Sequence, residues 1–554
     1  MKKIISVFLV TVMLFAVMAP CASAITEERL PIVYIRGNGE TIYGPDGNPV
    51  GARLEDIFGG DGEDVAGINR DVIVESVVNI ILPLLSEGLI FDKWDTYGRA
   101  IYDEISPLFK NAGLDAEGNS PEGIGVSAER LAESENQAKR DSKNYNLYDY
   151  EFCFDWRLSP YDHVDRLHEY IQTVKKSTGK SQVCIYVRCF GGSLAMAYLE
   201  KYGSKKDVAR IMFTDVLSNG TAVVSDAFSG KIEFEAAYVQ RYLGQLEQCD
   251  ALGIGQGFTL TGLTNEIVFK TLDLFTKTGT ADMLLDGVED LYEKLYKSLL
   301  PALCFATGIA TQVNYWTCVY EEDFDAALDI MFGSKEAQEA YPGVIRKIKE
   351  YREKVTSKLP ELYRTFSEEY GIRIGVSAKY GYMNIPFIES MNDMTDALVS
   401  VKDASFGATC ADINTVLSDK SLKNVASKYI SADKKVNTST CIFPETTWVI
   451  KNAHHDCWEL SDTIGLAFLR NKDMTVDSYA QYPAFMRFYE ETDKYEPLTE
   501  ENCEDYEWYS AAEERPTTES ILASMLRWFK MIFEILTKLL KGELELGSLF
   551  GKEA

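Results

Sequence analysis

The chain has 554 residues, of which 46% are hydrophobic and 25% are charged, as in a globular protein long enough to bury a large core. Its formal net charge of −29 excludes the basic footprint of a nucleic-acid-binding protein, so we expect no nucleic-acid partner. The 11 cysteines include no C-x-x-C pair, which argues against a structural zinc site and against a dense disulfide framework.

The first 24 residues have the pattern of a secretory signal peptide. Lys2 and Lys3 precede an uncharged run over residues 4–19, and Ala22-Ser23-Ala24 provide a small-residue cleavage site. We therefore expect residues 1–24 to be removed and the protein to be secreted or extracytoplasmic. The alternative interpretation of this segment is a membrane anchor.

Short apolar runs rich in β-branched residues alternate with stretches of helical periodicity. The runs cover residues 31–35, 151–154, 183–187, 209–213, 372–378 and 447–450. Such runs are typical of strands buried on both faces, and their alternation with helices indicates a mainly parallel sheet flanked by helices. We expect an α/β fold whose sheet is built from two halves, residues 25–230 and residues 366–515.

The stretch between these halves, residues 231–365, carries helical periodicity and no strong strand signal, as in the segment VEDLYEKLYKSLL. We interpret it as a large helical insertion in the sheet domain. The interpretation that we favour is a cap, or lid, over a pocket. The alternative is additional scaffold.

The C-terminal segment, residues 516–554, contains a strongly amphipathic helix. Basic residues such as Arg527 and Lys530 recur at steps of three or four on one face, while Trp528 and Phe529 belong to the apolar face. A basic, aromatic-containing helix at the end of an acidic protein predicts peripheral contact with an anionic membrane surface. Docking of the apolar face onto the protein body is an alternative of equal weight.

The segment VRCFGG, residues 187–192, places Cys189 at a sharp turn between a strand and a helix. A nucleophile elbow has the pattern G-x-Nuc-x-G, in which small flanking residues permit a strained backbone that exposes the nucleophile. Gly191 fits the second small position, whereas Val187 replaces the first and is expected to crowd the turn. Because a helix N-terminus favours a thiolate, Cys189 is the predicted nucleophile. The alternative is an ordinary core cysteine.

A nucleophile at such an elbow needs a histidine as base and a carboxylate that orients it, in the chain order nucleophile, acid, histidine. The chain has four histidines, of which His163 and His168 precede the elbow. His454 and His455 follow the last predicted strand, where the order requires the base. We choose His455, with His454 as the alternative.

The acid should follow the predicted strand over residues 372–378. Asp396 comes first after this strand, and Asp433 lies in a similar sequence setting further along. We favour Asp396 because it is nearer its strand, and Asp433 remains the rival. For either residue the alternative role is a loop-capping aspartate, which is the commonest task of such a side chain.

An oxyanion hole requires two backbone N–H groups aimed at the developing charge. Phe190, directly after the predicted nucleophile, would supply one of them. The second would come from Asn38, which lies between two glycines in the turn after the first predicted strand.

Three segments together resemble one family. PIVYIRGNG, from residue 31, is similar to the strand and "HG" entrance of lipases, with Arg36 in place of histidine. FDWRLSP, residues 154–160, resembles the Asp-Trp-Arg segment of the lecithin:cholesterol acyltransferase family. YVRCFGGSLAMAYLEKY, from residue 186, is similar to that family's G-H-S-x-G-G elbow, with Arg188 for histidine and Cys189 for serine.

The resemblance implies an α/β-hydrolase that acts on a lipid or another carboxylic ester and needs neither metal nor cofactor. The expected function is therefore that of a lipase-like hydrolase or an acyltransferase with a triad of Cys189, His455 and Asp396. The alternative is a catalytically inactive relative that binds a lipid, a glycan or a cell-surface partner.

Overall fold

The computed structural model describes residues 29–37, 40–50, 93–107, 109, 111–233, 238, 242, 245, 289–386, 388–492 and 494–505. The predicted signal peptide, the C-terminal amphipathic helix, Asn38 and much of the predicted insertion lie outside the described residues. None of the helices within these ranges is long and apolar enough to cross a membrane.

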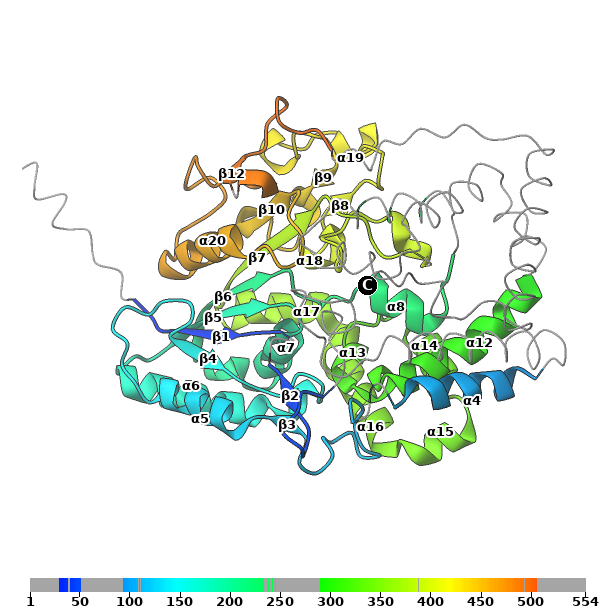
Figure 1. Cartoon of the computed structure of the whole chain (residues 1–554). Helices are drawn as coiled ribbons and strands as arrows, with labels where there is room; N and C mark the ends of the chain where they lie inside the picture. Colours follow the sequence, from blue (N-terminus) through cyan, green and yellow to red (C-terminus); the bar gives the residue numbers. More distant parts are fainter. Residues whose placement is uncertain are drawn as a thin grey trace, which may run out of the picture.

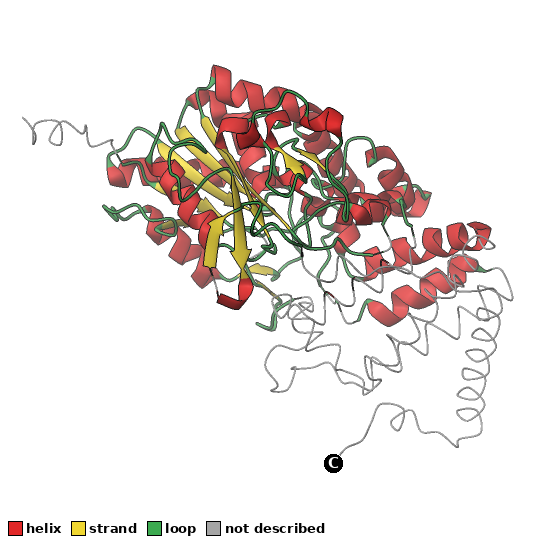
Figure 2. Ribbon diagram, turned by 90° about the horizontal axis from the view of Figure 1, so that it is seen from above, coloured by secondary structure: helices red, strands yellow, loops and turns green. Residues whose placement is uncertain are grey.

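A large, mainly parallel sheet forms the centre of the molecule (Figures 1 and 2). Its strands follow the spatial order β12-β11-β10-β7-β6-β5-β1-β4, and only the edge strand β12 runs antiparallel to its neighbour. The strands are β1 Ile32–Ile35, β4 Tyr150–Phe152, β5 Val183–Arg188, β6 Val208–Thr214, β7 Arg373–Tyr380, β10 Thr447–Lys451, β11 Phe485–Tyr489 and β12 Lys494–Pro497. The predicted α/β class is thus confirmed, and all six predicted strands are present.

The sequence reasoning missed β11 and β12. Both are short, and Arg487 interrupts the apolar run of β11. Two further pairs of two-residue strands lie outside the main sheet: β2 Ile42–Tyr43 with β3 Gly125–Val126, and β8 Thr409–Cys410 with β9 Val436–Asn437.

Helices cover both faces of the main sheet (Figure 2). The longer helices of the described residues, including those away from the sheet, are α4 Trp94–Ile105, α5 Ala128–Ala138, α6 Val164–Thr178, α7 Gly191–Tyr202, α8 Ala222–Ser229, α12 Glu289–Ala306, α14 Phe324–Phe332, α16 Pro342–Lys354 and α20 Glu459–Arg470. The shorter ones are α13 Val313–Trp316, α15 Lys335–Ala340, α17 Leu359–Arg364, α18 Val401–Ala404 and α19 Asp419–Leu422.

The side chains of β5 alternate between two hydrophobic layers, as the two-residue period of a strand requires. Ile185 and Val187 pack in the layer that contains α6 and α7. Cys184 and Tyr186 pack on the opposite face, in the layer that contains α20. This burial on both faces explains why the strand reads as an unbroken apolar run.

Strands β6 and β7 are neighbours in the sheet although more than 150 residues separate them in the chain. The described part of this connection is helical and includes α8, α12 and α13 to α17. In Figure 1 its helices α12, α14 and α15 lie beside α4, away from the sheet. Helices α4 and α12 share a small apolar cluster formed by Trp94, Tyr97 and Ile101 with partly buried leucines.

Candidate active site

Cys189 occupies the turn between β5 and α7 with a backbone φ of +48°, a left-handed conformation that is strained for a cysteine. The two glycines after it allow this turn to pack closely. A Cβ on Gly191 would lie 2.5 Å from the carbonyl oxygen of Ile35, and one on Gly192 would lie 2.7 Å from Cβ of Val216. The helix therefore begins directly against the ends of β1 and β6.

Val187, which we expected to crowd the turn, does not prevent the strained geometry. Its side chain is fully buried in the hydrophobic layer between the sheet and α6 and α7. Because this layer accommodates a branched side chain, the turn that follows still reaches the positive φ at Cys189. The valine is thus compatible with the elbow geometry that its size put in doubt.

His455 and Asp396 form a tight pair at the same edge of the sheet. His455 lies in the loop after β10, and its Nδ1 is 2.8 Å from Oδ2 of Asp396, in the loop after β7. The backbone N–H of His455 also donates to the carbonyl oxygen of Asp396 at 2.8 Å. Oδ1 of Asp396 accepts the N–H groups of Leu398 and Val399, so the carboxylate is fixed from two sides.

The electrostatics of His455 connect it to Cys189. Burial lowers the pKa of His455, but Asp396, which is hydrogen-bonded to the ring, and Cys189 outweigh burial, so the pKa lies well above its usual value. Since Nδ1 is paired with Asp396, Nε2 is the ring atom left for the sulfur. Nε2 is buried and makes no hydrogen bond within the described residues. Burial raises the pKa of Asp396, yet His455 and the Val399 N–H reverse this effect and hold it below its usual value.

The two rival residues lie in other environments. His454 packs edge-on to Tyr382 with the ring centroids 5.9 Å apart, and burial lowers its pKa. Asp433 accepts hydrogen bonds from Lys451 Nζ at 2.8 Å and from the Tyr380 hydroxyl at 2.7 Å. The structure therefore brings His455 and Asp396 together and engages His454 and Asp433 elsewhere.

The structure describes one of the two predicted oxyanion donors, Phe190. Within the described residues the backbone N–H of Phe190 has no backbone acceptor. Gly37, at the end of β1, approaches the elbow so closely that a Cβ there would lie 2.6 Å from Cβ of Cys189. Asn38 and Gly39 lie outside the described residues. The residue before them, Gly37, contacts the turn at Cys189.

Four of the twelve non-glycine residues with positive φ in the described part of the chain lie around this site. Besides Cys189, non-glycine residues with positive φ occur directly after β6 (Asp215, +44°), beside the acid (Ala397, +80°) and after β10 (Asn452, +59°). Each lies at or beyond the carboxyl end of a strand of the main sheet. Strain of this kind persists where the surrounding structure enforces it, and it gathers at functional sites.

Aromatic side chains cover the elbow. The Trp156 and Phe190 rings stack with centroids 6.2 Å apart, and Tyr315 meets Phe190 edge-on at 5.1 Å. Burial raises the pKa of Tyr315, and Cys318 and Cys189 add to the rise. Beneath this cover Cys189 is 5% exposed. Sequence reasoning missed Tyr315 because it comes from the long connection between β6 and β7.

The FDWRLSP segment combines a site residue with an anchor. Arg157 forms a buried, two-pronged pair with Asp155, through Nε to Oδ1 at 3.0 Å and Nη2 to Oδ2 at 2.7 Å. The same guanidinium donates to Ser120 Oγ at 2.7 Å and thereby holds a distant loop. Trp156, between them, lies against the elbow and donates its indole N–H to the Glu40 carbonyl oxygen. The segment therefore fixes the wall of the site.

Arg188, the residue before Cys189, packs among aromatic rings toward α20. Its guanidinium lies 4.3 Å from the ring centre of Trp458 and donates to the Tyr148 hydroxyl at 2.7 Å. It also forms an ion pair with Asp462. Trp458 in turn contacts the His455 ring edge-on, with centroids 5.3 Å apart. Strand β5 and the loop that carries His455 are thus linked through Trp458.

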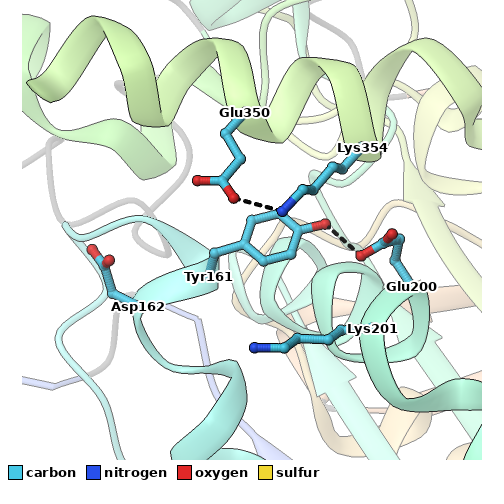
Figure 3. A pocket seen from close by; sticks show the side chains of 6 residues that line it. All are labelled: Tyr161, Asp162, Glu200, Lys201, Glu350 and Lys354. Carbon is cyan, nitrogen blue, oxygen red and sulfur yellow. Dashed lines mark hydrogen bonds and ion pairs between the residues drawn. The ribbon is translucent and has the colours of Figure 1, made fainter.

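A separate hollow of about 470 Å³ lies near the far end of α7 (Figure 3). Its charged and polar lining is paired internally, with Tyr161 donating to Glu200 at 2.9 Å and Lys354 to Glu350 at 2.6 Å. Glu200 is nine residues along α7 from Gly191, roughly 14 Å from the elbow at 1.5 Å per residue. This hollow is not part of the Cys189 site.

The nine cysteines within the described residues are all free thiols, Cys189 included. Among the same residues no group of three or more His, Cys, Asp or Glu side chains is placed to hold a metal ion. The site is therefore built, as far as it is described, from a thiol, an imidazole and a carboxylate.

Comparison with known proteins found no match for this chain among protein-family models, among curated proteins or among solved structures. What the chain does must therefore be argued from the chemistry of its own residues.

Proposed function

We propose that the protein is a lipase-like ester hydrolase or acyltransferase of the α/β-hydrolase type, with Cys189 as nucleophile, His455 as base and Asp396 as the orienting acid. The observation that carries the proposal is the placement of a strained cysteine at the β5–α7 turn and of a buried His455–Asp396 pair from two distant loops at the same edge of the sheet. Such a juxtaposition is the recognised geometry of nucleophilic acyl transfer.

The topology supports the same assignment. The nucleophile follows β5, the acid follows β7 and the histidine follows β10, all at the carboxyl edge of a parallel sheet. The chain order nucleophile, acid, histidine is that of α/β-hydrolases. This agreement between order and geometry is independent of the sequence motif around Cys189.

In the proposed acylation step, the Cys189 thiolate attacks the ester carbonyl carbon, and the tetrahedral oxyanion receives the N–H groups of Phe190 and Asn38. The intermediate collapses to a thioester on Cys189, and the His455 imidazolium protonates the departing alkoxide through Nε2. The raised pKa of His455 favours the protonated imidazole that this transfer needs. Asp396, which remains ionised, orients the ring and stabilises its charge.

In deacylation, His455 takes a proton from water or from an acceptor alcohol, whose oxygen attacks the thioester carbonyl. The second tetrahedral intermediate collapses, releases the carboxylic acid or the new ester, and returns Cys189 to the thiolate paired with imidazolium. With Cys189 5% exposed, entry of an ester requires the cover of Trp156, Phe190 and Tyr315 to move aside. These aromatic rings suit an apolar acyl group.

We further propose that the protein acts outside the cytoplasm and contacts membranes peripherally. This part of the proposal depends on the signal-peptide pattern of residues 1–24 and on the basic amphipathic pattern of residues 516–554. Co-sedimentation with anionic liposomes, with and without the residues after Glu519, tests the membrane contact. Equal pelleting of the two chains would contradict it.

The test of catalysis is chromogenic ester turnover by the parent chain and by Cys189→Ala, Cys189→Ser and His455→Gln. We expect Cys189→Ala to abolish turnover above background and His455→Gln to lower kcat by about 10² to 10⁴-fold. Cys184→Ala is the matched control, because Cys184 is a buried cysteine in the same hydrophobic cluster as Cys189 but lies near the opposite end of β5, away from the turn. Equal turnover by the parent and Cys189→Ala would refute the nucleophile. No turnover by the parent on short and long acyl esters would favour a binding protein instead.

A further inference from the structure

A fully buried ion pair lies directly behind the proposed base. Lys379 Nζ is 2.7 Å from Oδ2 of Asp215, and both side chains are 0% exposed. Lys379 is the penultimate residue of β7, and Asp215 directly follows β6. The pair therefore occupies the carboxyl ends of two adjacent strands, between the nucleophile on β5 and the base beyond β10.

The same ammonium group contacts the base loop in two ways. Lys379 Nζ donates to the backbone carbonyl oxygen of His455 at 2.9 Å. It also lies 4.1 Å from the ring centre of Trp458, whose indole meets the His455 imidazole edge-on. One cation thus supports both the main chain and the aromatic neighbour of the catalytic ring.

Stability alone does not account for this pair. Removing two charges from water costs free energy that their mutual attraction regains only with very good geometry and further hydrogen bonds. Neither carboxylate oxygen of Asp215 has a well-formed hydrogen bond within the described residues, and the Asp215 backbone is strained at φ +44°. The Asp215 carboxylate thus has no hydrogen bond beside its ion pair to offset its burial, whereas the contact of Lys379 with the His455 loop is well formed.

The pair also belongs to the electrostatic system of the site. Burial raises the pKa of Asp215 to about 6, Lys379 opposes this rise, and the charges of Asp396 and His455 act on the same carboxyl. Lys379 in turn lowers the pKa of Asp396. The following charged and titratable groups therefore act on His455: Asp396 from the loop after β7, Cys189 from the turn after β5, Lys379 and Asp215 from the ends of β7 and β6, and His454 from its own loop.

We propose that Lys379, held in place by Asp215, is a positioning residue that anchors the His455 main chain so that Nε2 faces Cys189. The inference rests on the proposed acyl-transfer function and adds to it two residues that touch neither substrate nor the reacting atoms. Asp215 supplies the counter-charge that allows an ammonium group to be buried at this point.

Two double variants of the full chain separate anchoring from charge. Lys379→Met with Asp215→Asn removes both charges together and also removes the donor to the His455 carbonyl. Lys379→Gln with Asp215→Asn removes the same charges but keeps a side-chain N–H donor. Because neither variant leaves a lone buried charge, both are expected to fold, which thermal melting and far-ultraviolet circular dichroism will verify.

We expect the Met/Asn variant to lose about 10²-fold in kcat with little change in KM, since a base displaced by about 1 Å costs that much. The Gln/Asn variant should recover a large part of this loss. Equal kcat in the two variants, or parent-like kcat in the Met/Asn variant, would overturn the positioning role.

Imidazole NMR gives a readout that does not depend on turnover. The chain has four histidines, so selective ring-¹⁵N-histidine labelling yields signals from four imidazoles, and His455→Gln identifies those of one of them. The variant Lys379→Met with Asp215→Asn should shift the ring signals of His455 and their titration, and it should leave the signals of His163 and His168 unchanged. Unchanged His455 signals would overturn the inference even if the parent hydrolyses esters, whereas a shift in a parent without turnover would support the anchor and refute only the proposed function.

Discussion

Asp396→Asn is the sharpest single test of the proposed triad. The substitution preserves shape, and its carbonyl oxygen can still accept the N–H groups of Leu398 and Val399 that Oδ1 receives now. The amide NH₂ group of the asparagine then takes the place of Oδ2, which lies 2.8 Å from His455 Nδ1. Because NH₂ can only donate, Nδ1 must accept a hydrogen bond rather than donate one. The neutral ring then carries its proton on Nε2, which is the wrong tautomer for a base facing Cys189.

The expected loss follows from this tautomer change. A triad with an inverted histidine loses about 10⁴-fold in kcat, which corresponds to roughly 5.4 kcal/mol at about 1.36 kcal/mol per tenfold. The pKa of His455 should also fall, because the Asp396 charge is the largest influence that raises it. The assay is ester turnover between pH 5 and pH 9, with the His455 titration followed by imidazole NMR.

Asp433→Asn is the matched control for this prediction. Asp433 was the rival acid, and its partner Lys451 keeps a second carboxylate, Asp505, at 2.6 Å after the substitution. We expect its kcat to stay near that of the parent. A parent-like Asp396→Asn, or an Asp433→Asn variant that loses activity while remaining folded, would refute the assigned acid.

Three further predictions concern the neighbourhood of the site. Gly37→Ala places a Cβ 2.6 Å from that of Cys189, so we expect about a 10²-fold loss of kcat with a small change in melting temperature; parent-like kcat would show that the elbow can yield. Trp156→Ala removes one ring of the aromatic cover, so alkylation of Cys189 by iodoacetamide should become faster. An unchanged alkylation rate would contradict the inference that Trp156 shields Cys189 from solvent. Asp393→Asn should raise the free energy of unfolding in urea by roughly 1–2 kcal/mol at pH 8 but not at pH 4. The sign follows because burial raises the folded-state pKa of Asp393 to about 6, so its ionisation weakens the fold as pH rises; a loss of stability at pH 8 would refute this.

The strands and the elbow were predictable because their signals are local. The run over residues 183–187 is apolar at every position because both faces of β5 are buried, and the glycines at 191 and 192 are needed where the turn packs against β1 and β6. Strand β12 was missed because an edge of the sheet tolerates charged residues and leaves a weak pattern. Strand β11 was missed because it is short and Arg487 interrupts its apolar run.

The amino-acid sequence by itself determined the α/β class, the cysteine at the strand-to-helix turn and the order in which its candidate partners follow. Tertiary structure alone decided which partner meets which. His454 and His455 differ by one residue, and a loop that turns one imidazole toward Asp396 necessarily turns its neighbour elsewhere. Likewise, Lys379 meets the His455 carbonyl only because β7 and β10 pair side by side, and pairing between distant segments leaves no local mark in a chain.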